Sequence, residues 1–235
     1  VVHGGGPEIT SFLNQLVKQS TFVSGLRVTD AETVELAEMV LVGKVNSEIV
    51  KMLNRQGAKA VGLSGKDGDL IIARKHMATI HHDGQTDKVD IGFVGDVAKV
   101  NTGLISTLLA NNYIPVIAPI GGGLDGESYN INADYVAGEV AGALGAEKLL
   151  LLTDVEGIYR DCRDENSFIS TLSFAEAKEM IEQGAIEGGM IPKVESCIRA
   201  LTGGAAKAHI IDGRLPHSLL LEVLTEKGIG TEVVN

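Results

Sequence analysis

Apolar residues recur along this chain in two patterns, one typical of helices and one of strands. Spacings of three and four residues predict helices over residues 7–19, 31–42, 46–56, 104–111, 132–144, 173–183, 192–201 and 218–225. Thr29 is the expected N-cap of the helix at 31–42. Short apolar runs predict buried strands over 58–63, 114–120, 148–152 and 208–211. Because strands alternate with helices, the pattern indicates an α/β fold with a mainly parallel sheet.

Residues 70–100 interrupt this alternation of strands and helices. Apolar and polar residues alternate over 70–73 and again over 89–100, which predicts β-hairpins. We expect this insertion to form a lid or an edge ribbon.

Glycine is the residue type in excess. The chain has 29 glycines among 235 residues, against a usual frequency of about 7%. Glycine is expected where the backbone turns tightly or approaches a ligand closely. Four clusters stand out, at residues 4–6, 62–68, 121–126 and 184–189.

Charge and apolar content exclude several classes of protein. The net charge of −11 argues against a general nucleic-acid-binding surface. No apolar run approaches the roughly 20 residues that span a bilayer, so we expect no membrane contact. Cys162 and Cys197 are far apart in sequence and are expected to be free thiols in a reducing compartment.

The glycine clusters differ in what they predict. Residues 4–6 follow a strand end and precede a helix. Either their N–H groups bind an anion, or the glycines simply allow a tight turn. Residues 62–68 resemble a P-loop, but Asp67 replaces its Mg²⁺-binding Ser or Thr, which favours an ordinary loop. Residues 121–126 match G-x-G-x-x-G, yet extended chain follows, so we expect only a turn. After the fourth cluster, Lys193 at a helix N-terminus either binds phosphate or is a solvated lysine.

Polar side chains with potential for chemistry gather in three places. Asn130, Asn132 and Asp134 are every second residue of the segment between a strand and a helix, so in extended chain they share one face. Either they face a ligand there, or they cap the helix that follows. Arg27, among small and apolar residues, either captures a carboxylate or forms a surface ion pair. Residues 150–159 run from a buried strand into a polar loop, where a nucleotide's base or ribose would fit.

Two other kinds of site have no support in the sequence. His76, His81 and His82 have a spacing that fits no defined zinc site, so we expect solvated histidines. No Gly-x-Ser-x-Gly motif indicates a hydrolase.

Five runs together resemble the amino acid kinase family. They are HGGGPEI at 3–9, GLRVT at 25–29, YNINAD at 129–134, LTDVEG at 152–157 and GGMIPK at 188–193. The resemblance covers nearly the whole chain in the right order. It implies a three-layer α/β/α sandwich in one domain, whose part at about 1–145 binds N-acetyl-L-glutamate and whose part at about 146–235 binds ATP. The implied reaction moves the γ-phosphoryl group of MgATP to the substrate's side-chain carboxylate, a step of arginine biosynthesis.

The resemblance also implies roles for individual residues. The amides of Gly5 and Gly6 hold the reacting carboxylate and phosphoryl oxygens, Arg27 clamps the α-carboxylate, and Asn130 and Asn132 belong to the substrate site. Lys193 stabilises the transferring phosphoryl group, and Asp134 organises the lysines around it. The ATP site is lined by Asp154, Val155, Glu156, Gly157, Ile158, Tyr159, Ala185, Ile186 and Glu187. Mg²⁺ is held mainly by the nucleotide's phosphates, without a protein metal site. Such a transfer needs positioning and charge neutralisation more than covalent chemistry.

One element of the family pattern would lie before Val1. The family carries a second catalytic lysine in a Lys-Tyr/Leu-Gly-Gly strand end ahead of the His-Gly-Gly-Gly loop. We therefore expect a segment to be missing before Val1. A chain without that lysine is expected to be nearly inactive, since removing one such group typically costs about 2.7–4 kcal/mol at the transition state.

Residues 209–222 and 225–231 resemble the arginine-inhibited branch of the family. The resemblance implies that His209, Glu222 and Gly228 bind L-arginine as an inhibitor; the alternative is an amphipathic helix with a solvated Glu222. It implies a homo-oligomer, either a dimer or, with a further N-terminal helix, a ring-shaped hexamer of linked dimers. Control by a PII signalling protein is an expectation for photosynthetic lineages. The expected location is the cytoplasm, or the plastid stroma of a photosynthetic eukaryote.

Two other functions stay open at this point. One is another carboxylate or carbamate kinase of the same fold. The other is a non-catalytic arginine-sensing or partner-binding subunit, which the expected absence of one lysine would favour.

Overall fold

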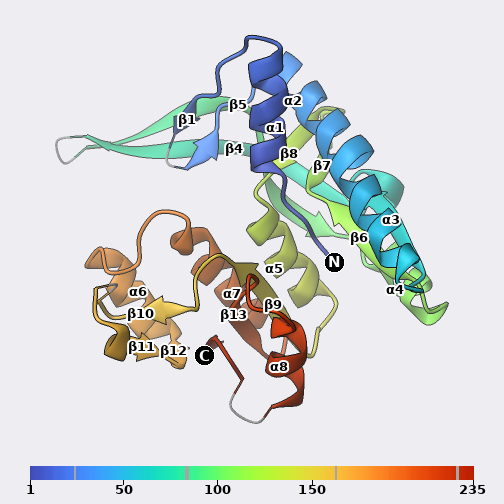
Figure 1. Cartoon of the computed structure of the whole chain (residues 1–235). Coiled ribbons are helices and arrows are strands. Elements are labelled where there is room, and N and C mark those ends of the chain that lie inside the picture. Colours follow the sequence, from blue (N-terminus) through green and yellow to red (C-terminus); the bar gives the residue numbers. More distant parts are fainter. Residues whose placement is uncertain (24, 83–84, 162, 226–227) are drawn as a thin grey trace. The chain divides into compact units, whose positions relative to one another are not determined.

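The chain forms two compact units, which we call the N-terminal unit (Val1–Val136) and the C-terminal unit (Ala137–Asn235). The computed structural model describes all residues except 24, 83–84, 162 and 226–227 (Figure 1). The expected free thiol at Cys162 thus lies outside the described residues, whereas Cys197 is buried and is not part of a disulfide. The boundary between the units falls inside a helix, a few residues before the division expected near residue 145.

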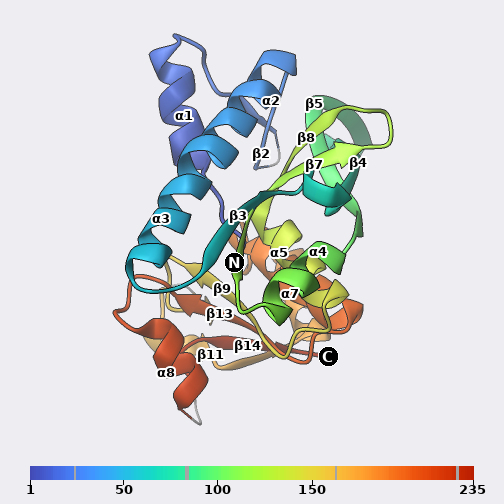
Figure 2. The ribbon, with the colours of Figure 1, turned by 90° about the vertical axis from the view of Figure 1, so that its right-hand side faces the viewer.

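A helical layer opens the N-terminal unit. It consists of α1 (Gly6–Gln15) and a rod in which α2 (Ala31–Glu38), the π-helix η1 (Met39–Asn46) and α3 (Ser47–Arg55) follow one another without a break (Figure 2). The predicted N-cap was wrong by one residue, because the Asp30 carboxylate accepts the Thr33 N–H at 2.8 Å. Apolar residues of α1, α2 and η1 pack on Ala118 and Ile120 to form one core.

Parallel strands support this helical layer. Strand β3 (Ala60–Ser64) pairs in parallel with β6 (Ile114–Ala118), and α4 (Gly103–Ala110) precedes β6. Val2 forms a parallel bridge with Ile117, so the first residues extend along the other side of β6. The expectation that the chain opens on the end of a strand agrees with this pairing.

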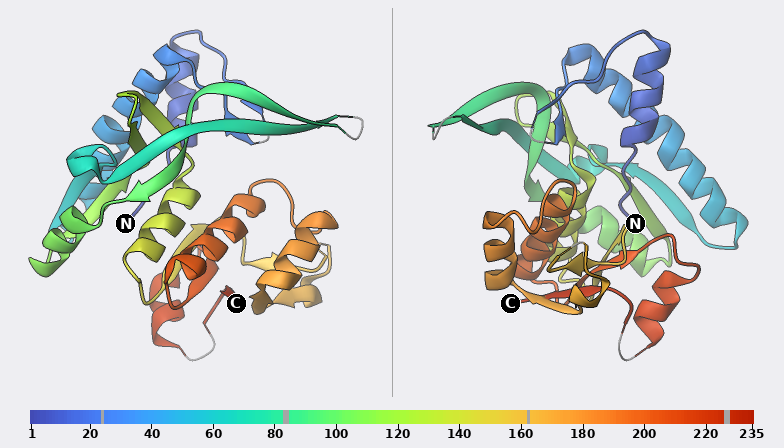
Figure 3. Two further views of the ribbon diagram at one scale, coloured as in Figure 1. Left: turned by 180° about the vertical axis from the view of Figure 1, so that it is seen from behind. Right: turned by 60° about the vertical axis from the view of Figure 1, so that its left-hand side comes forward.

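Residues 70–100 form one long hairpin rather than several. Strands β4 (Ile71–His82) and β5 (Gln85–Val100) pair from Ile71↔Val100 outward and leave the body of the N-terminal unit as a ribbon (Figure 3). The prediction of an edge ribbon is wrong for the base of the hairpin. There β7 (Ile120–Gly123) and β8 (Ser128–Ile131) pair with β4 and β5 and close a four-stranded barrel. The expected turn at 121–126 is therefore a strand in its first half.

The C-terminal unit is built on a four-stranded mixed sheet. Its order is β12 (Thr171–Ser173), β14 (Thr231–Val234), β13 (Ala208–Asp212) and β9 (Leu149–Thr153), with β14 antiparallel to β13 and the other pairs parallel. A short hairpin joins β10 (Ile158–Tyr159) to β11 (Phe168–Ile169), with the 3-10 turn η3 (Glu165–Ser167) before β11. Neither this hairpin nor β12 and β14 was predicted.

Helices complete the C-terminal unit and enclose its core. They are the later part of α5 (Ala133–Ala143), α6 (Phe174–Glu182), α7 (Met190–Gly203) and α8 (Ser218–Leu224). A capping box between Ser173 and Glu176 starts α6. Leu172, Val194, Cys197 and Ile210 are among the fully buried side chains of the core. The predicted α/β class is confirmed, and within the described residues no helix is long and apolar enough to cross a bilayer.

Candidate functional site

The first glycine cluster is a strand-to-helix turn with free amides at its end. His3 N–H donates to the Ile117 carbonyl at 3.2 Å, and the first bond of α1 runs from Ile9 N–H to Gly5 O at 3.0 Å. Amides in the first turn of a helix have no intrahelical acceptor, so those that follow His3 are available to an anion. A Cβ at Gly5 would lie 2.5 Å from Leu41, which leaves no space for a side chain there.

Arg27 lies beside this turn and is not a surface residue. It is 8% exposed, and one terminal nitrogen donates to the Gly6 carbonyl at 3.0 Å and to Thr10 Oγ1 at 2.8 Å. The other terminal nitrogen donates to Ser20, and the guanidinium lies 4.7 Å from the ring centre of Phe22. Among the described residues no carboxylate pairs with Arg27, so the alternative of a surface ion pair is wrong for this part of the chain.

The short strand β2 (Leu26–Arg27) is anchored through Thr29. The Thr29 hydroxyl donates to the Arg27 carbonyl at 2.8 Å, and the Thr29 carbonyl accepts the Phe93 N–H at 2.6 Å. Gly92 makes this approach possible, since its φ is +84° and a Cβ there would collide with the Thr29 carbonyl. Burial lowers the pKa of Arg27 from its usual value, but guanidinium stays charged in proteins. The site therefore holds a fixed positive charge.

The polar run at 129–134 divides between a strand and a helix. Asn130 lies in β8, one residue before its end, and pairs with Ile120 of β7 and Val94 of β5. Asn132 caps α5, because its Oδ1 accepts the Asp134 N–H at 2.8 Å. Asp134 lies in the first turn of α5, where a carboxylate suits the helix dipole. The capping alternative is thus correct for Asn132, and the shared extended face does not continue to Asp134.

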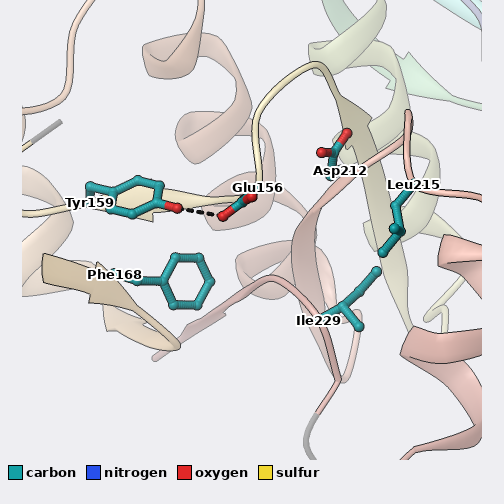
Figure 4. A pocket seen from close by; sticks show the side chains of 6 residues that line it. All are labelled: Glu156, Tyr159, Phe168, Asp212, Leu215 and Ile229. Atoms are coloured by element: carbon teal, nitrogen blue, oxygen red, sulfur yellow. Dashed lines mark hydrogen bonds between the residues drawn. The ribbon is translucent and has the colours of Figure 1, made fainter. Parts of the chain in front are cut away.

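A pocket of about 310 Å³ opens in the C-terminal unit beside the predicted nucleotide segment (Figure 4). Tyr159 and Phe168 line one side, with their rings edge to face at 5.3 Å, and the Tyr159 hydroxyl donates to Glu156 at 2.6 Å. Asp212, Leu215 and Ile229 line the other side (Figure 4). Glu156 and Tyr159 are predicted site residues, whereas the other four lining residues were missed.

Asp212 had a signal in the sequence that we overlooked. It ends β13, and its register partner Thr153 ends the parallel strand β9. The carboxyl ends of neighbouring parallel strands are where α/β folds bind ligands. Both oxygens of Asp212 accept bonds from Arg214, at 3.0 and 2.9 Å, and these bonds lower the pKa of Asp212.

The remaining predicted nucleotide and catalytic residues lie around the start of α7. Lys193 is half-buried in the first turn and a half of that helix. Ala185 and Glu187 are exposed in the loop before α7, whereas Ile186 is 2% exposed and belongs to the core of the C-terminal unit. Lys193 and the glycine turn belong to different units, and their joint action stays a prediction.

The three predicted effector residues are brought together at one buried carboxylate. Glu222 is 2% exposed, so the alternative of a solvated Glu222 is wrong. Its Oε1 accepts from Lys148 Nζ at 3.0 Å and lies 2.9 Å from His209 Nδ1, and its Oε2 accepts the Ile229 N–H at 2.9 Å. A Cβ at Gly228 would lie 2.5 Å from Oε2. Lys148 was not predicted, because it lies far from the other members in sequence.

The charges of this cluster follow from its contacts. Burial raises the pKa of Glu222, but the Ile229 amide, Lys148 and His209 outweigh it, so the net shift is downward and the carboxylate is ionised. Burial lowers the pKa of His209 more than Glu222 raises it. His209 Nε2 is a buried nitrogen without a hydrogen bond and lies 3.6 Å from Glu232.

Metal-binding side chains do not cluster in the described part of the chain. No group of three or more His, Cys, Asp or Glu there is placed to hold a metal ion. His76 Nδ1 donates to Asp96 Oδ1 at 3.0 Å. The side chains of His81 and His82 lie outside the described residues.

Comparison with known proteins gives a consistent result along the whole chain. Residues 1–212 match the model of the amino acid kinase family. An acetylglutamate kinase from Moorella thermoacetica is 63% identical over 234 residues, which are 100% of this chain and 79% of that protein. An acetylglutamate kinase from Pelotomaculum thermopropionicum is 58% identical, over 99% of this chain and 79% of that protein. The structure of an N-acetylglutamate synthase from Neisseria gonorrhoeae, complexed with coenzyme A and N-acetyl-glutamate, is similar with a TM-score of 0.81 and 27% identity, over 100% of this chain and 51% of that one.

Proposed function

Because the chain belongs to the amino acid kinase family, we propose that it transfers the γ-phosphoryl group of ATP to the side-chain carboxylate of N-acetyl-L-glutamate. Its relatives at 54–63% identity carry the name acetylglutamate kinase. The product is an acyl phosphate, N-acetyl-L-glutamyl 5-phosphate. We further propose that the protein works in the cytoplasm and in arginine biosynthesis.

The buried Arg27 is the observation that carries the choice of substrate. A guanidinium that is 8% exposed and has no carboxylate partner among the described residues is a costly arrangement unless a ligand supplies the anion. Its donors lie beside the Gly6 carbonyl, at the end of the turn that offers free amides. We assign Arg27 to the α-carboxylate of the substrate and the amides of Gly5 and Gly6 to the reacting oxygens. Asn130 is assigned to the acetylamino group.

Lys193 and Asp134 complete the proposed catalytic set. Lys193 neutralises charge on the transferring phosphoryl group, which is the main requirement of such a reaction. Asp134 orients the lysines around that group. Asn132 acts through the N-cap of α5 and keeps Asp134 in place.

The pocket beside Tyr159 supports the proposed nucleotide site. Glu156 and Tyr159 come from the segment assigned to ATP, and the aromatic edge of Phe168 offers an apolar wall. We propose that Mg²⁺ enters with ATP and is held mainly by its phosphates, where it would neutralise their charge.

The buried Glu222 cluster favours a second role, the binding of L-arginine as an inhibitor. Carboxylate oxygens accept about four hydrogen bonds, and two are already used in Glu222, by Lys148 and Ile229. A guanidinium would take a remaining position or replace the Lys148 ammonium, which is also a cation. A homo-oligomer and contact with a PII protein stay predictions.

One assay separates the proposed reaction from its alternatives. The full-length protein is incubated with MgATP, N-acetyl-L-glutamate and hydroxylamine, which traps an acyl phosphate as a hydroxamate. We expect hydroxamate and ADP in equal amounts with N-acetyl-L-glutamate, and little with L-glutamate, L-aspartate or carbamate. Preference for another acceptor would assign a different kinase, and arginine binding without any turnover would favour the sensing subunit.

A further inference from the structure

Two buried polar side chains meet behind the glycine turn. His3 is 8% exposed and Asn46 is 3% exposed. The Asn46 Nδ2 group lies 3.1 Å from His3 Nε2 and donates to the Val116 carbonyl at 2.8 Å. Gly62 makes room for this amide, because a Cβ there would collide with Asn46 Oδ1. Polar groups this deeply buried are expected to make specific bonds.

The contacts of Asn46 determine which nitrogen of His3 carries the proton. The Val116 carbonyl only accepts, so the atom beside it is the donor Nδ2 and not Oδ1. The second hydrogen of Nδ2 then points to His3 Nε2, which must accept and is unprotonated. The proton of the neutral ring therefore lies on Nδ1. Burial lowers the pKa of His3, so the ring is neutral near pH 7.

The protonated Nδ1 of His3 in turn fixes one peptide group of the turn. It lies 2.8 Å from the Gly4 carbonyl and donates to it. The Gly4 carbonyl and the Gly5 N–H belong to the same peptide group, which is trans. In a trans peptide the two bonds point in opposite directions. Holding the carbonyl toward His3 therefore turns the Gly5 N–H away from His3.

The π-helix η1 supports the same peptide group from its other end. Asn46 is the last residue of η1, and Leu41 and Val45 of η1 face Gly5. A Cβ at Gly5 would lie 2.5 Å from Leu41 and 3.4 Å from Val45. A π-helix is rare and is frequent at functional sites. Here one helical segment packs on Gly5 and also determines the His3 tautomer.

We propose that Asn46 and His3 are positioning residues that aim the Gly5 amide at the reacting anion. Asn46 selects the Nδ1–H tautomer of His3, and His3 holds the Gly4–Gly5 peptide in the orientation that presents the Gly5 N–H. This inference rests on the function proposed above, in which that amide binds a reacting oxygen. Neither side chain touches the substrate.

Replacement of His3 by two different amides tests the proposal through kcat. Asn places its amide near the position of Nδ1 and can still donate to the Gly4 carbonyl, whereas Gln places it near Nε2. We expect His3→Gln to lower kcat by about 10- to 100-fold and His3→Asn to recover most of it. A side chain that only filled space would give the reverse order, because Gln is the larger residue, and that order would overturn the proposal.

Asn46→Leu is expected to lower kcat as much as His3→Gln, with little further loss in the double variant. Asn54→Leu is the matched control. Asn54 belongs to the same helical rod and makes two bonds to Ala60, at 2.7 and 3.2 Å, at its far end. The Asn54→Leu substitution should lower the urea concentration at the midpoint of unfolding without lowering kcat. Equal kcat for the two Leu variants would contradict the proposal.

Asn46→Asp gives a pH signature that a structural role would not. The new carboxylate raises the pKa of His3; among the described side chains, Glu8 is another charged group that acts on the ring. Below that pKa both ring nitrogens are protonated and Nδ1 still donates to Gly4. Above it the carboxylate retains the proton on Nε2, and Nδ1 no longer donates. We expect kcat of this variant to fall as pH rises, a limb that is absent from the unmodified chain; an unchanged pH profile would count against the tautomer.

A spectroscopic measurement keeps this test separate from the proposed function. In ¹⁵N-glycine-labelled protein, His3→Gln and Asn46→Leu should shift the Gly5 amide signal, and Asn54→Leu should not. Absence of such a shift overturns the positioning pair even if the enzyme is active. If the unmodified chain forms no acyl phosphate, the proposed function fails, and the Gly5 signal alone then decides whether the pair orients that amide.

Discussion

The hydroxyl of Thr231 joins the last strand of the chain to Ile158, whose N–H it accepts at 2.9 Å. The same hydroxyl donates to the Ile169 carbonyl at 2.6 Å, and Thr231 is fully buried. Two residues earlier, the Ile229 N–H donates to Glu222. One short segment therefore contacts both the proposed nucleotide segment and the proposed effector cluster.

Thr231→Val keeps the shape of this side chain and removes both bonds. The Ile158 N–H and the Ile169 carbonyl become buried and unsatisfied, which costs about 1–3 kcal/mol each. We expect a lower free energy of unfolding in urea and a higher KM for ATP. Thr107→Val removes an exposed helical bond to Gly103 and is the control. An unchanged KM would show that β10 holds its position without Thr231.

Arg27→Lys tests the clamp on the α-carboxylate. Lysine keeps the charge but has no planar fork and loses some of the bonds to Gly6, Thr10 and Ser20. Loss of one hydrogen bond to a charged group costs about 1.5–3 kcal/mol, so we expect the KM for N-acetyl-L-glutamate to rise about 10- to 100-fold. The KM for ATP should stay constant. Arg55→Lys, on the exposed end of α3, is the control, and equal KM values for both variants would rule out the clamp.

Lys193→Ala separates transition-state stabilisation from binding. If Lys193 neutralises the transferring phosphoryl group, kcat should fall about 100- to 1000-fold, with a much smaller change in the KM for N-acetyl-L-glutamate. Lys178→Ala, at a side chain that is 79% exposed, is the control for loss of one lysine. A normal kcat in the Lys193 variant would remove that residue from the catalytic set.

Glu222→Gln tests the arginine site by a measurement that does not need turnover. A ligand that binds only the folded protein raises its Tm, so L-arginine should stabilise the unmodified chain and have little effect on the variant. L-Citrulline, which is similar in shape but uncharged, should stabilise neither. Glu182→Gln changes an exposed carboxylate and should respond like the unmodified chain. An undiminished arginine response in the Glu222 variant would place the site elsewhere.

The stability of the protein should fall as the solution becomes acidic, beginning near pH 6.5. Burial lowers the pKa of His209 and of His3 below the usual 6.5, so the unfolded chain takes up protons before the folded chain does. Their contribution is complete above pH 6.5 and is lost as pH falls below it. We expect His209→Gln to reduce the slope of unfolding free energy against pH between 6.5 and 5.5. His217→Asn, at an exposed histidine, should leave that slope unchanged.

The parts of the fold that sequence patterns predicted are those whose signals are local. The turn at residues 4–6 and the helix after it follow from glycine, proline and apolar spacing within a dozen residues. Strand β14 has only four residues and is defined by its pairing with β13 and β12, distant in sequence. No local pattern distinguishes it from a chain end. The barrel at the base of the hairpin was missed for the same reason, since the residues of β4 that pair with β7 lie fifty positions before their partners.

The candidate site likewise contains residues that local sequence indicated and partners that only the fold brings near them. Arg27 stood out because a charged residue among apolar ones is unusual, but its partners Thr10 and Ser20 look ordinary in sequence. Lys148 and Ile229 reach Glu222 only through the fold. Asn46 lies at the end of a π-helix, and its inward direction depends on backbone hydrogen bonds that apolar spacing does not reveal.

The π-helical segment also makes the site sensitive to the number of residues in the helical rod, and not only to their identity. Successive residues of an α-helix are rotated by about 100°. Deleting one residue between Leu41 and Asn46 would therefore leave Leu41 on Gly5 and swing Asn46 to another face of the rod. The number of residues between Leu41 and Asn46 therefore sets the angle between their side chains around the helical rod. We expect this segment to tolerate substitutions more readily than an insertion or a deletion.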